Sequence, residues 1–215
     1  MQLRVAGRRC VVVGAGRVGA RRASQLVEAG AEVVVVAPAA GERVADLARA
    51  GRLVHHPRAF LPGDAAGAFL VVVATGDPAA DDGAAVAAGD AGALVERADR
   101  AAEGDVAVSG VVRRGPLSVA VSTGGLAPAV SAWATGLLDA GLDGLLGLDA
   151  DGVALLVDVV AEVRSELAAG RGSGPGVTPA RPDWRSALDR TMLDLIDSGR
   201  RAQAKERLLA CLSSS

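Results

Sequence analysis

The sequence predicts an α/β protein in which a doubly wound parallel sheet is followed by a small α+β region and then by helices. Three observations lead to this fold class. Valine-rich segments alternate with helical segments over roughly the first hundred residues, which is the pattern of repeated βαβ units. The first valine-rich segment runs directly into a glycine-rich turn. Beyond residue 105 the alternation stops, and short strands and then helical periodicity take its place.

The glycine-rich turn is the most informative element. A strand over Cys10–Val13 leads into Gly14, Gly16 and Gly19, which form a G-x-G-x-x-G pattern. Gly14 permits a tight turn, Gly16 lets the backbone approach a pyrophosphate, and Gly19 lets the following helix lie against the sheet. The N-terminus of that helix offers unpaired N–H groups to an anion. We therefore expect a Rossmann-type domain whose cofactor-binding residues include Gly14, Gly16, Arg17, Val18 and Gly19.

Further strands and helices complete the predicted sheet. The first helix has an apolar face and stops at Gly30, which is a typical helix-ending residue. The remaining elements are expected to be a strand over Glu32–Val36, a helix over Glu42–Ala50, a brief strand over Leu53–His55, a buried strand over Ala68–Ala74, a turn and helix start over Thr75–Pro78, a helix over Asp82–Ala88 and a strand over Ala93–Val95. These elements make about five strands of a doubly wound sheet.

Ligands of such sheets bind at the carboxyl ends of the strands. This rule adds Pro38, Ala39, Thr75 and Asp77 to the expected cofactor site. An acid that binds the ribose usually ends the second strand, but none is present here, so we expect backbone groups at Pro38 and Ala39 to replace it. Arg43 follows closely and offers an alternative contact for a 2′-phosphate.

The remainder of the chain has a different organisation. Short strands are expected over Val106–Ser109 and Leu117–Val121, with a helix over Pro128–Leu138. We expect three parts: a dinucleotide-binding domain over 1–105, a dimerisation region over 106–145 and a helical region over 146–215. The helical region combines a stripe of Val153, Leu156, Val157, Val160, Val163 and Leu167, a flexible joint over Gly170–Gly176, and two terminal helices separated near Gly199, with Trp184, Leu188, Leu195 and Ile196 facing inward.

Composition excludes several classes of partner. The 215 residues are 50% hydrophobic, carry a formal charge of −2 and include two Trp, two Phe and no Tyr. Dispersed arginines and few aromatic rings argue against nucleic acid. No apolar run is long enough for a signal peptide or a membrane span, so we expect a cytoplasmic protein without a membrane partner. Cys10 is expected in the core, and adjacent His55 and His56 point to opposite faces of a strand, so no metal site is expected.

A second glycine turn, Ser122–Pro128, leads from a strand into a helix. Together with the first turn, Ala74-Thr75-x-Asp77 and Arg114-Gly115-x-Leu117, it resembles the precorrin-2 dehydrogenase and sirohydrochlorin ferrochelatase family, the N-terminal module of siroheme synthase. The resemblance extends from about Arg4 to Leu138. It implies NAD-dependent oxidation of precorrin-2 to sirohydrochlorin and, in bifunctional members, insertion of ferrous iron to give siroheme. It also implies a homodimer.

The same resemblance places the key acid of the family at Asp99, counted back without a gap from Gly115–Leu117. A base at this position serves both oxidation and metal insertion, because each releases protons, and an efficient base would need a raised pKa. The alternative is a solvated loop acid. The family often has an uncharged Asn-Val-x before the aspartate, whereas this chain has Glu96, Arg97 and Ala98. A salt bridge to Asp99 would lower its pKa and weaken it as a base.

Substrate contacts are expected after the dinucleotide-binding domain. Precorrin-2 carries many carboxylates, and the guanidinium groups of Arg113 and Arg114 are suited to binding them in pairs. The alternative is that both arginines only decorate a hairpin turn. The second glycine turn adds Thr123, Gly124 and Gly125, although the residues matching Thr123 and Ala127 are often serine in the family.

Two other functions remain open at the level of the sequence. The same fold serves as a regulatory domain that senses NAD or NADH without catalysis, and such a sensor needs neither Asp99 nor the second glycine turn. A dehydrogenase that has lost chelation differs only in whether metal insertion into sirohydrochlorin is accelerated.

Overall fold

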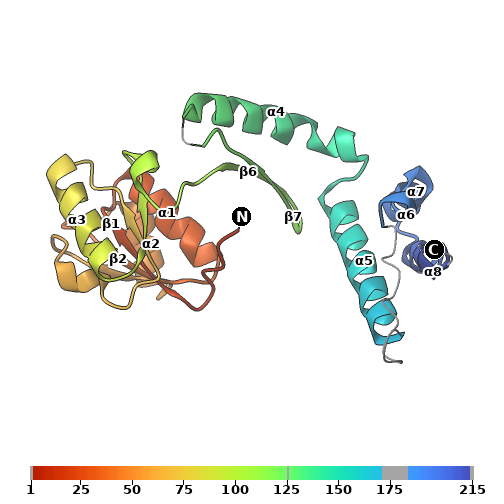
Figure 1. Cartoon of the computed structure of the whole chain (residues 1–215), viewed down its shortest axis with the longest axis horizontal. Helices are drawn as coiled ribbons and strands as arrows, with labels where there is room; N and C mark the ends of the chain where they lie inside the picture. Colours follow the sequence, from red (N-terminus) through yellow and green to blue (C-terminus); the bar gives the residue numbers. More distant parts are fainter. Residues whose placement is uncertain (1, 125, 171–183, 214–215) are drawn as a thin grey trace, which may run out of the picture. The chain divides into compact units, whose positions relative to one another are not determined.

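The computed structural model describes residues 2–124, 126–170 and 184–213, which fall into two compact units (Figure 1). The first unit comprises residues 1–108 and 124–126, and the second comprises residues 109–123 and 127–215.

The first unit contains a parallel five-stranded sheet with the order β3-β2-β1-β4-β5. Its strands are β1 (Arg9–Val13), β2 (Glu32–Val36), β3 (Val54–His56), β4 (Leu70–Val73) and β5 (Leu94–Arg97). Val11 of the central β1 pairs with Val34 of β2 and with Val71 of β4. The predicted parallel α/β sheet is therefore confirmed. Successive strands are added on one side of β1 up to β3 and on its other side from β4 onward, so the strand order switches beside β1.

Helices cover both faces of this sheet. They are α1 (Arg17–Glu28), α2 (Glu42–Arg49) and α3 (Pro78–Asp90), with short 3-10 turns η1 (Pro62–Ala65) and η2 (Ala101–Glu103). α3 begins at Pro78, which confirms the helix start predicted over Thr75–Pro78, and the helix predicted over Asp82–Ala88 is the middle of this longer helix. Pro78 occupies its first turn and the Asp77 carboxylate caps it.

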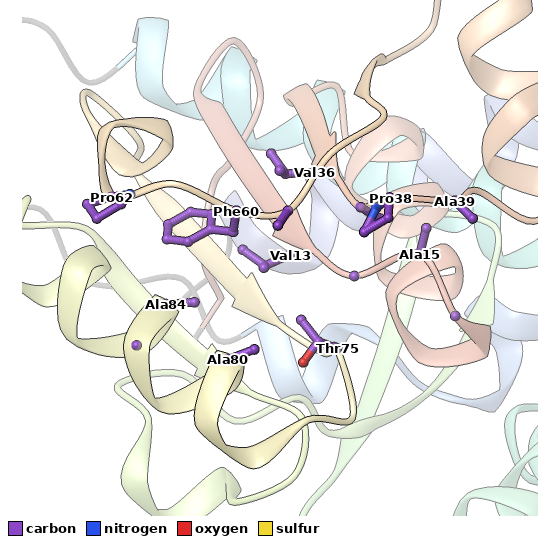
Figure 2. A pocket seen from close by; sticks show the side chains of 15 residues that line it. Val13, Ala15, Val36, Pro38, Ala39, Phe60, Pro62, Thr75, Ala80 and Ala84 are labelled. Atoms are coloured by element: carbon purple, nitrogen blue, oxygen red, sulfur yellow. The ribbon is translucent and has the colours of Figure 1, made fainter.

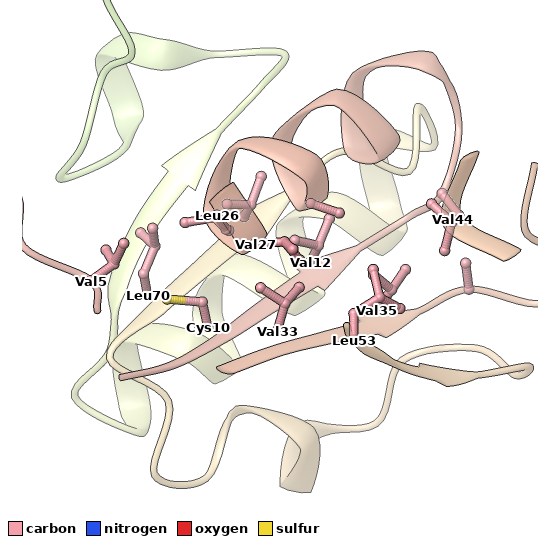
Figure 3. Packing of buried hydrophobic residues seen from close by; sticks show 14 residues of the cluster. Val5, Cys10, Val12, Leu26, Val27, Val33, Val35, Val44, Leu53 and Leu70 are labelled. Carbon is pink, nitrogen blue, oxygen red and sulfur yellow. The ribbon is translucent and has the colours of Figure 1, made fainter. Parts of the chain in front are cut away.

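Successive strand residues belong to two separate cores, as expected for strands buried on both faces. Val12 and Val35 pack with Leu26 of α1 and Val44 of α2 (Figure 3). On the other face, Val11, Val13, Val71 and Val73 pack with Ala84 and Ala88 of α3. Cys10 is fully buried in the first core, and this burial raises the pKa of its thiol to about 11. Its predicted role as a small core hydrophobe is confirmed.

The second unit begins with an antiparallel hairpin of β6 (Gly110–Arg114) and β7 (Leu117–Val121), against which α4 (Pro128–Leu146) packs. The strand predicted over Val106–Ser109 is wrong, because β6 starts only at Gly110. Val106 instead donates its backbone N–H to Val95 at the edge of the first sheet. A Cβ at Gly110 would lie 2.1 Å from the Thr135 hydroxyl oxygen, so glycine permits the close approach of β6 to α4.

The remaining helices are α5 (Ala150–Gly170), α6 (Trp184–Ala187), α7 (Arg190–Asp197) and α8 (Arg201–Ser213). Their core includes Val159, Val163, Met192, Ile196 and Leu208. Leu188, which was predicted to face inward, is 37% exposed, and Val157, which was predicted on one stripe with Val153 and Val163, is 41% exposed. Val157 lies at the edge of the buried stripe of α5.

The flexible joint was expected over Gly170–Gly176, and residues 171–176 of this segment lie outside the described residues. In the parts of the chain that the structure describes, every helix is too short or too polar to cross a membrane.

Candidate functional site

A cavity of about 550 Å³ lies at the carboxyl ends of the central strands. Its lining includes Gly14 and Gly16 from the first turn, Pro38 and Ala39 after β2, and Thr75 after β4. Five of the nine residues expected to bind a cofactor therefore lie together around one hollow. This size is within the usual range for pockets that bind small molecules and cofactors.

The three turn glycines have different local environments. Gly14 has φ +99°, and a Cβ there would lie 2.4 Å from the carbonyl oxygen of Ala74. A Cβ at Gly19 would lie 2.0 Å from the carbonyl oxygen of Gly14. Gly16 differs, because a Cβ there would meet nothing within 4 Å. Gly14 and Gly19 are therefore required by the protein's own packing, whereas Gly16 faces open space that a ligand can occupy.

Gly16 is also the N-cap of α1, and among the described residues no side chain caps this end of the helix. The first N–H groups of a helix need partners, and an anion supplies them with help from the helix dipole. The first turn of α1 contains no acidic residue that would repel an anion. The open N-cap and the space beside it together fit a diphosphate.

The walls of the cavity are apolar. Figure 2 shows the Phe60 ring and Pro62 on one side of the view and Ala15, Pro38 and Ala39 on the other. Among the described residues that line the cavity, none carries a charged side chain. Phe60 was missed by sequence reasoning because it is an isolated aromatic residue in the loop after β3, without any periodic pattern around it.

Thr75 and Asp77 organise the loop after β4. Thr75 donates from its hydroxyl to Asp81 Oδ1 at 2.5 Å and from its backbone N–H to the same oxygen at 3.0 Å. Asp77 accepts hydrogen bonds from the backbone N–H groups of Ala79 at 2.9 Å and Ala80 at 3.3 Å. Asp81, which is 1% exposed, was not predicted as a site residue. Thr75 lines the cavity, whereas the Asp77 carboxylate serves as the cap of α3.

Other predicted contacts lie outside the cavity lining. Arg17 and Val18 open α1 but do not line the cavity. Arg43, the alternative contact for a 2′-phosphate, donates from Nε to the Ser24 hydroxyl at 2.6 Å and is also absent from the lining. The His55 ring nitrogen Nε2 lies 2.9 Å from the carbonyl oxygen of Ala37.

Asp99 lies just beyond β5 in a cluster of charged side chains. Arg97 donates from Nε to Asp99 Oδ1 at 3.1 Å and from Nη2 to Asp99 Oδ2 at 2.8 Å. Arg100 adds a bond from Nε to Asp99 Oδ2 at 3.1 Å. The salt bridge to Asp99 that the preceding charged residues made possible is present. The paired bond to Arg97 holds the pKa of the Asp99 carboxyl well below its usual range, although the side chain is only 33% exposed.

This direction is opposite to the raised pKa expected of an efficient base. The spacing in the sequence explains the lowered pKa, since an arginine two residues before the aspartate lies on the same side of an extended chain. What the sequence did not indicate is that the Arg97 side chain is only 4% exposed.

In the second unit, Arg114 forms ion pairs with two aspartates of α4. Its Nη1 lies 2.9 Å from Asp139 Oδ1, and its Nε lies 2.5 Å from Asp143 Oδ1. The Arg113 side chain is exposed and has no hydrogen bond or ion pair among the described residues. Thr123 Oγ1 accepts a hydrogen bond from the N–H of Ala127 at 3.0 Å.

Gly124 has φ +64°, a left-handed conformation that glycine favours, and Gly125 lies outside the described residues. In the described parts of the chain, no group of three or more His, Cys, Asp or Glu side chains is arranged to hold a metal ion.

Residues 1–110 match a family described as putative NAD(P)-binding proteins. The chain belongs to this family. The match includes β1 to β5 and all the residues that line the cavity. The predicted dinucleotide-binding function of this part of the chain is therefore confirmed at the level of the family.

Two relatives extend the comparison. The siroheme synthase of Chromobacterium violaceum is 31% identical over 206 residues, which are 96% of this chain and 42% of that protein. Siroheme synthase 1 of Halorhodospira halophila is 32% identical over 213 residues, which are 98% of this chain and 42% of that protein. The chain thus spans less than half of the length of these relatives. The resemblance to siroheme synthase that the motifs indicated is confirmed.

The fold is similar to a solved structure of SirC, precorrin-2 dehydrogenase. The TM-score is 0.63 with 23% sequence identity, and the alignment covers 100% of this chain and 98% of that one. At this level of identity, the likeness supports the fold of the chain.

Proposed function

We propose that this protein oxidises precorrin-2 to sirohydrochlorin in siroheme biosynthesis, with NAD as the electron acceptor. The observation that carries the proposal is the uncapped N-terminus of α1 at Gly16, which opens into an apolar cavity. It occurs in a chain whose relatives are siroheme synthases and whose fold is similar to that of a precorrin-2 dehydrogenase.

The cavity favours NAD over NADP. A 2′-phosphate is usually bound by an arginine near the end of the second strand. The described residues that line this cavity carry no charge, and Arg43 is bonded to Ser24. A 2′-phosphate would lose part of its hydration without gaining a cation in return, which disfavours its binding.

The lining suggests where each part of NAD is held. Exposed N–H groups at Gly16 and the start of α1 would bind the diphosphate. Pro38 and Ala39, at the end of β2, would contact the adenosine ribose through backbone groups, and Phe60 would offer a flat apolar face to the adenine. Thr75, fixed by Asp81, lies after β4 on the other side of β1, the side expected for the nicotinamide.

The proposed reaction is a two-electron oxidation. NAD, when bound, accepts a hydride from the macrocycle and becomes NADH, and one proton is released. Asp99 is proposed as the catalytic carboxylate. Arg113, Arg114 and the turn at Thr123, Gly124 and Gly125 are proposed as contacts for the acidic tetrapyrrole. Of the two arginines, Arg113 is the stronger candidate, because Arg114 is already paired with Asp139 and Asp143.

A homodimer is part of the proposal, and α4 offers the surface for it. Val130, Trp133, Leu137 and Leu145 lie along one side of this helix and are 51%, 66%, 56% and 76% exposed. An exposed apolar stripe of this kind is typical of a protein interface. Trp133→Asp is expected to convert the dimer to a monomer in light scattering. Val86→Asp, at an exposed valine of α3, is the matched control that leaves the mass unchanged.

We also propose that ferrous iron is a second substrate, which is inserted into sirohydrochlorin after the oxidation. The protein is proposed to work in the cytoplasm.

The test is anaerobic incubation of the protein with precorrin-2 and NAD, followed by absorbance. Equal amounts of sirohydrochlorin and NADH are expected. Firm NAD binding without turnover would instead support the alternative, a regulatory domain that senses NAD or NADH. An inactive variant at Asp99 that retains NAD affinity distinguishes loss of chemistry from loss of cofactor.

A further inference from the structure

The end of β5 is held by ion pairs on both faces of the sheet. Glu96 points toward α1, where its Oε1 lies 2.6 Å from Arg22 Nε, and the two side chains are 5% and 14% exposed. Arg97 points toward α3, where its Nη1 lies 2.6 Å from Asp82 Oδ1. Adjacent strand residues point to opposite faces, so the pairs anchor the strand to two different helices. The loop that carries Asp99 therefore starts from a fixed strand end.

Arg97 also holds the Asp99 side chain in place. Its guanidinium donates two parallel hydrogen bonds to the two carboxylate oxygens of Asp99, at 3.1 and 2.8 Å. A paired arrangement of this kind fixes the orientation of a carboxylate as well as its charge. The Arg97 side chain is 4% exposed, so water competes little for its donors.

The charges around Asp99 are not balanced. Arg97 and Arg100 face three carboxylates, those of Asp82, Asp99 and Glu103. Glu103 lies 3.0 Å from Arg100 and 3.8 Å from Arg97. These groups belong to β5, the loop after it, α3 and η2, and together they leave one net negative charge.

We infer that Arg97 is a positioning residue that orients Asp99 and keeps it ionised, so that Asp99 acts as a fixed negative charge and not as the acceptor of the proton. This inference rests on the proposed oxidation. When a C–H bond breaks and its electron pair leaves with the hydride, positive charge develops on the macrocycle. A preorganised carboxylate stabilises that charge, and the proton is released to water.

The two roles of Asp99 demand opposite properties. A proton acceptor works best when its pKa lies near the working pH. A fixed charge works best when its carboxylate stays ionised and does not reorient. The two parallel hydrogen bonds from the guanidinium fork of Arg97, together with the bond from Arg100, serve the second requirement. They hold the pKa of Asp99 well below its usual range.

Three variants test the inference. Arg97→Gln removes the two parallel hydrogen bonds of the guanidinium fork, and Arg97→Lys keeps a charge without that fork. Arg49→Gln removes an exposed arginine whose ion pair within the described parts of the chain is with Asp46 on α2. Each carboxylate that Arg97 contacts also contacts Arg100, so the Gln variant leaves none without a cation. Two quantities are measured from about pH 2 to about pH 8: the titration of the Asp99 carboxyl carbon by NMR, and kcat/KM for NADH formation.

In the native protein, the Asp99 midpoint is expected at or below the acid end of this range, well under the ordinary Asp pKa near 4. In Arg97→Gln its titration midpoint should rise by at least about 1 pH unit, and kcat/KM should gain an acid limb at the same pH. Arg97→Lys should lie between the two, and Arg49→Gln should match the native protein. A purely structural role would lower kcat/KM equally at every pH and leave the Asp99 titration where it was.

Two outcomes overturn the inference: an Asp99 midpoint that Arg97→Gln leaves unchanged, or a raised midpoint with an unchanged pH profile. Failure of the proposed oxidation gives a different result, since the native protein would then form no NADH with precorrin-2. In that case the NMR titration still decides whether Arg97 controls Asp99. If Arg97→Gln does not fold, Arg97→Lys decides, because loss of the fork alone should raise the midpoint.

Discussion

Replacement of Gly16 by valine separates cofactor binding from folding. Gly16 has φ −67° and ψ −173°, an extended conformation that valine adopts readily. A Cβ there meets nothing within 4 Å, so the side chain enters open space in the unliganded protein. The main cost to folding is a poorer N-cap, about 1 kcal/mol or less. The Gly16→Val variant should therefore fold.

The effect on NAD should be larger. The valine side chain would occupy the space beside the N–H groups that we propose bind the diphosphate. Loss of one hydrogen bond to a charged group costs about 1.5–3 kcal/mol. This range corresponds to a dissociation constant about ten to a hundred times higher.

Calorimetric titration with NAD and urea unfolding measure the two effects separately. Gly89→Ala is the matched control, because Gly89 lies in α3, has open space around it and does not line the cavity. It should leave NAD affinity unchanged and increase the free energy of unfolding by about 0.5–1 kcal/mol. A folded Gly16→Val protein that binds NAD as tightly as the native protein would refute the placement of the diphosphate.

The remaining predictions concern stability, measured by urea unfolding. Gly19→Ala places a Cβ against a backbone carbonyl and should lower the free energy of unfolding by about 2 kcal/mol; a loss below the error of the measurement would contradict this. Arg22→Met leaves the buried Glu96 carboxylate unpaired and should lower the free energy of unfolding by about 3 kcal/mol. The double variant Arg22→Met/Glu96→Met should restore most of this loss, and equal stability of the single and double variants would argue against the ion pair. Arg58 lowers the pKa of Asp64, so the full stabilisation from this pair is present above the ordinary Asp pKa, near 4, and is lost as pH falls through the lower pKa of the folded state. Arg58→Met should therefore make the decline of the free energy of unfolding in acid shallower. An unchanged slope would contradict the stabilising role of the Arg58–Asp64 pair.

The part of the site built from backbone could be predicted from sequence. Glycine spacing after a valine-rich strand specifies a turn, a helix start and an open approach to the backbone, and all three depend on residues close in the chain. Gly14, Gly16 and Thr75 line the cavity as a result. Pro38 follows from the rule that strands of a parallel sheet end at a common edge.

Contacts between side chains far apart in sequence were not predictable in the same way. Arg43 bonds to Ser24 because α1 and α2 are neighbours, which no local pattern encodes. Phe60 lines the cavity from a loop whose course depends on the whole sheet. β6 begins after the predicted strand because Val106 bonds to Val95, a partner eleven positions earlier in the chain.

Charged residues at the end of β5 illustrate the same limit, with a consequence for chemistry. A hydropathy pattern assigns Glu96 and Arg97 to the surface, yet they are both 4% exposed because each has an ionic partner on a covering helix. If Arg97 positions Asp99 as inferred, the carboxylate is suited to stabilising positive charge during hydride loss. The same low affinity for protons makes it a poor acceptor for the pyrrole protons that metal insertion releases. Under the proposed function, the arrangement would therefore favour oxidation over chelation at this aspartate.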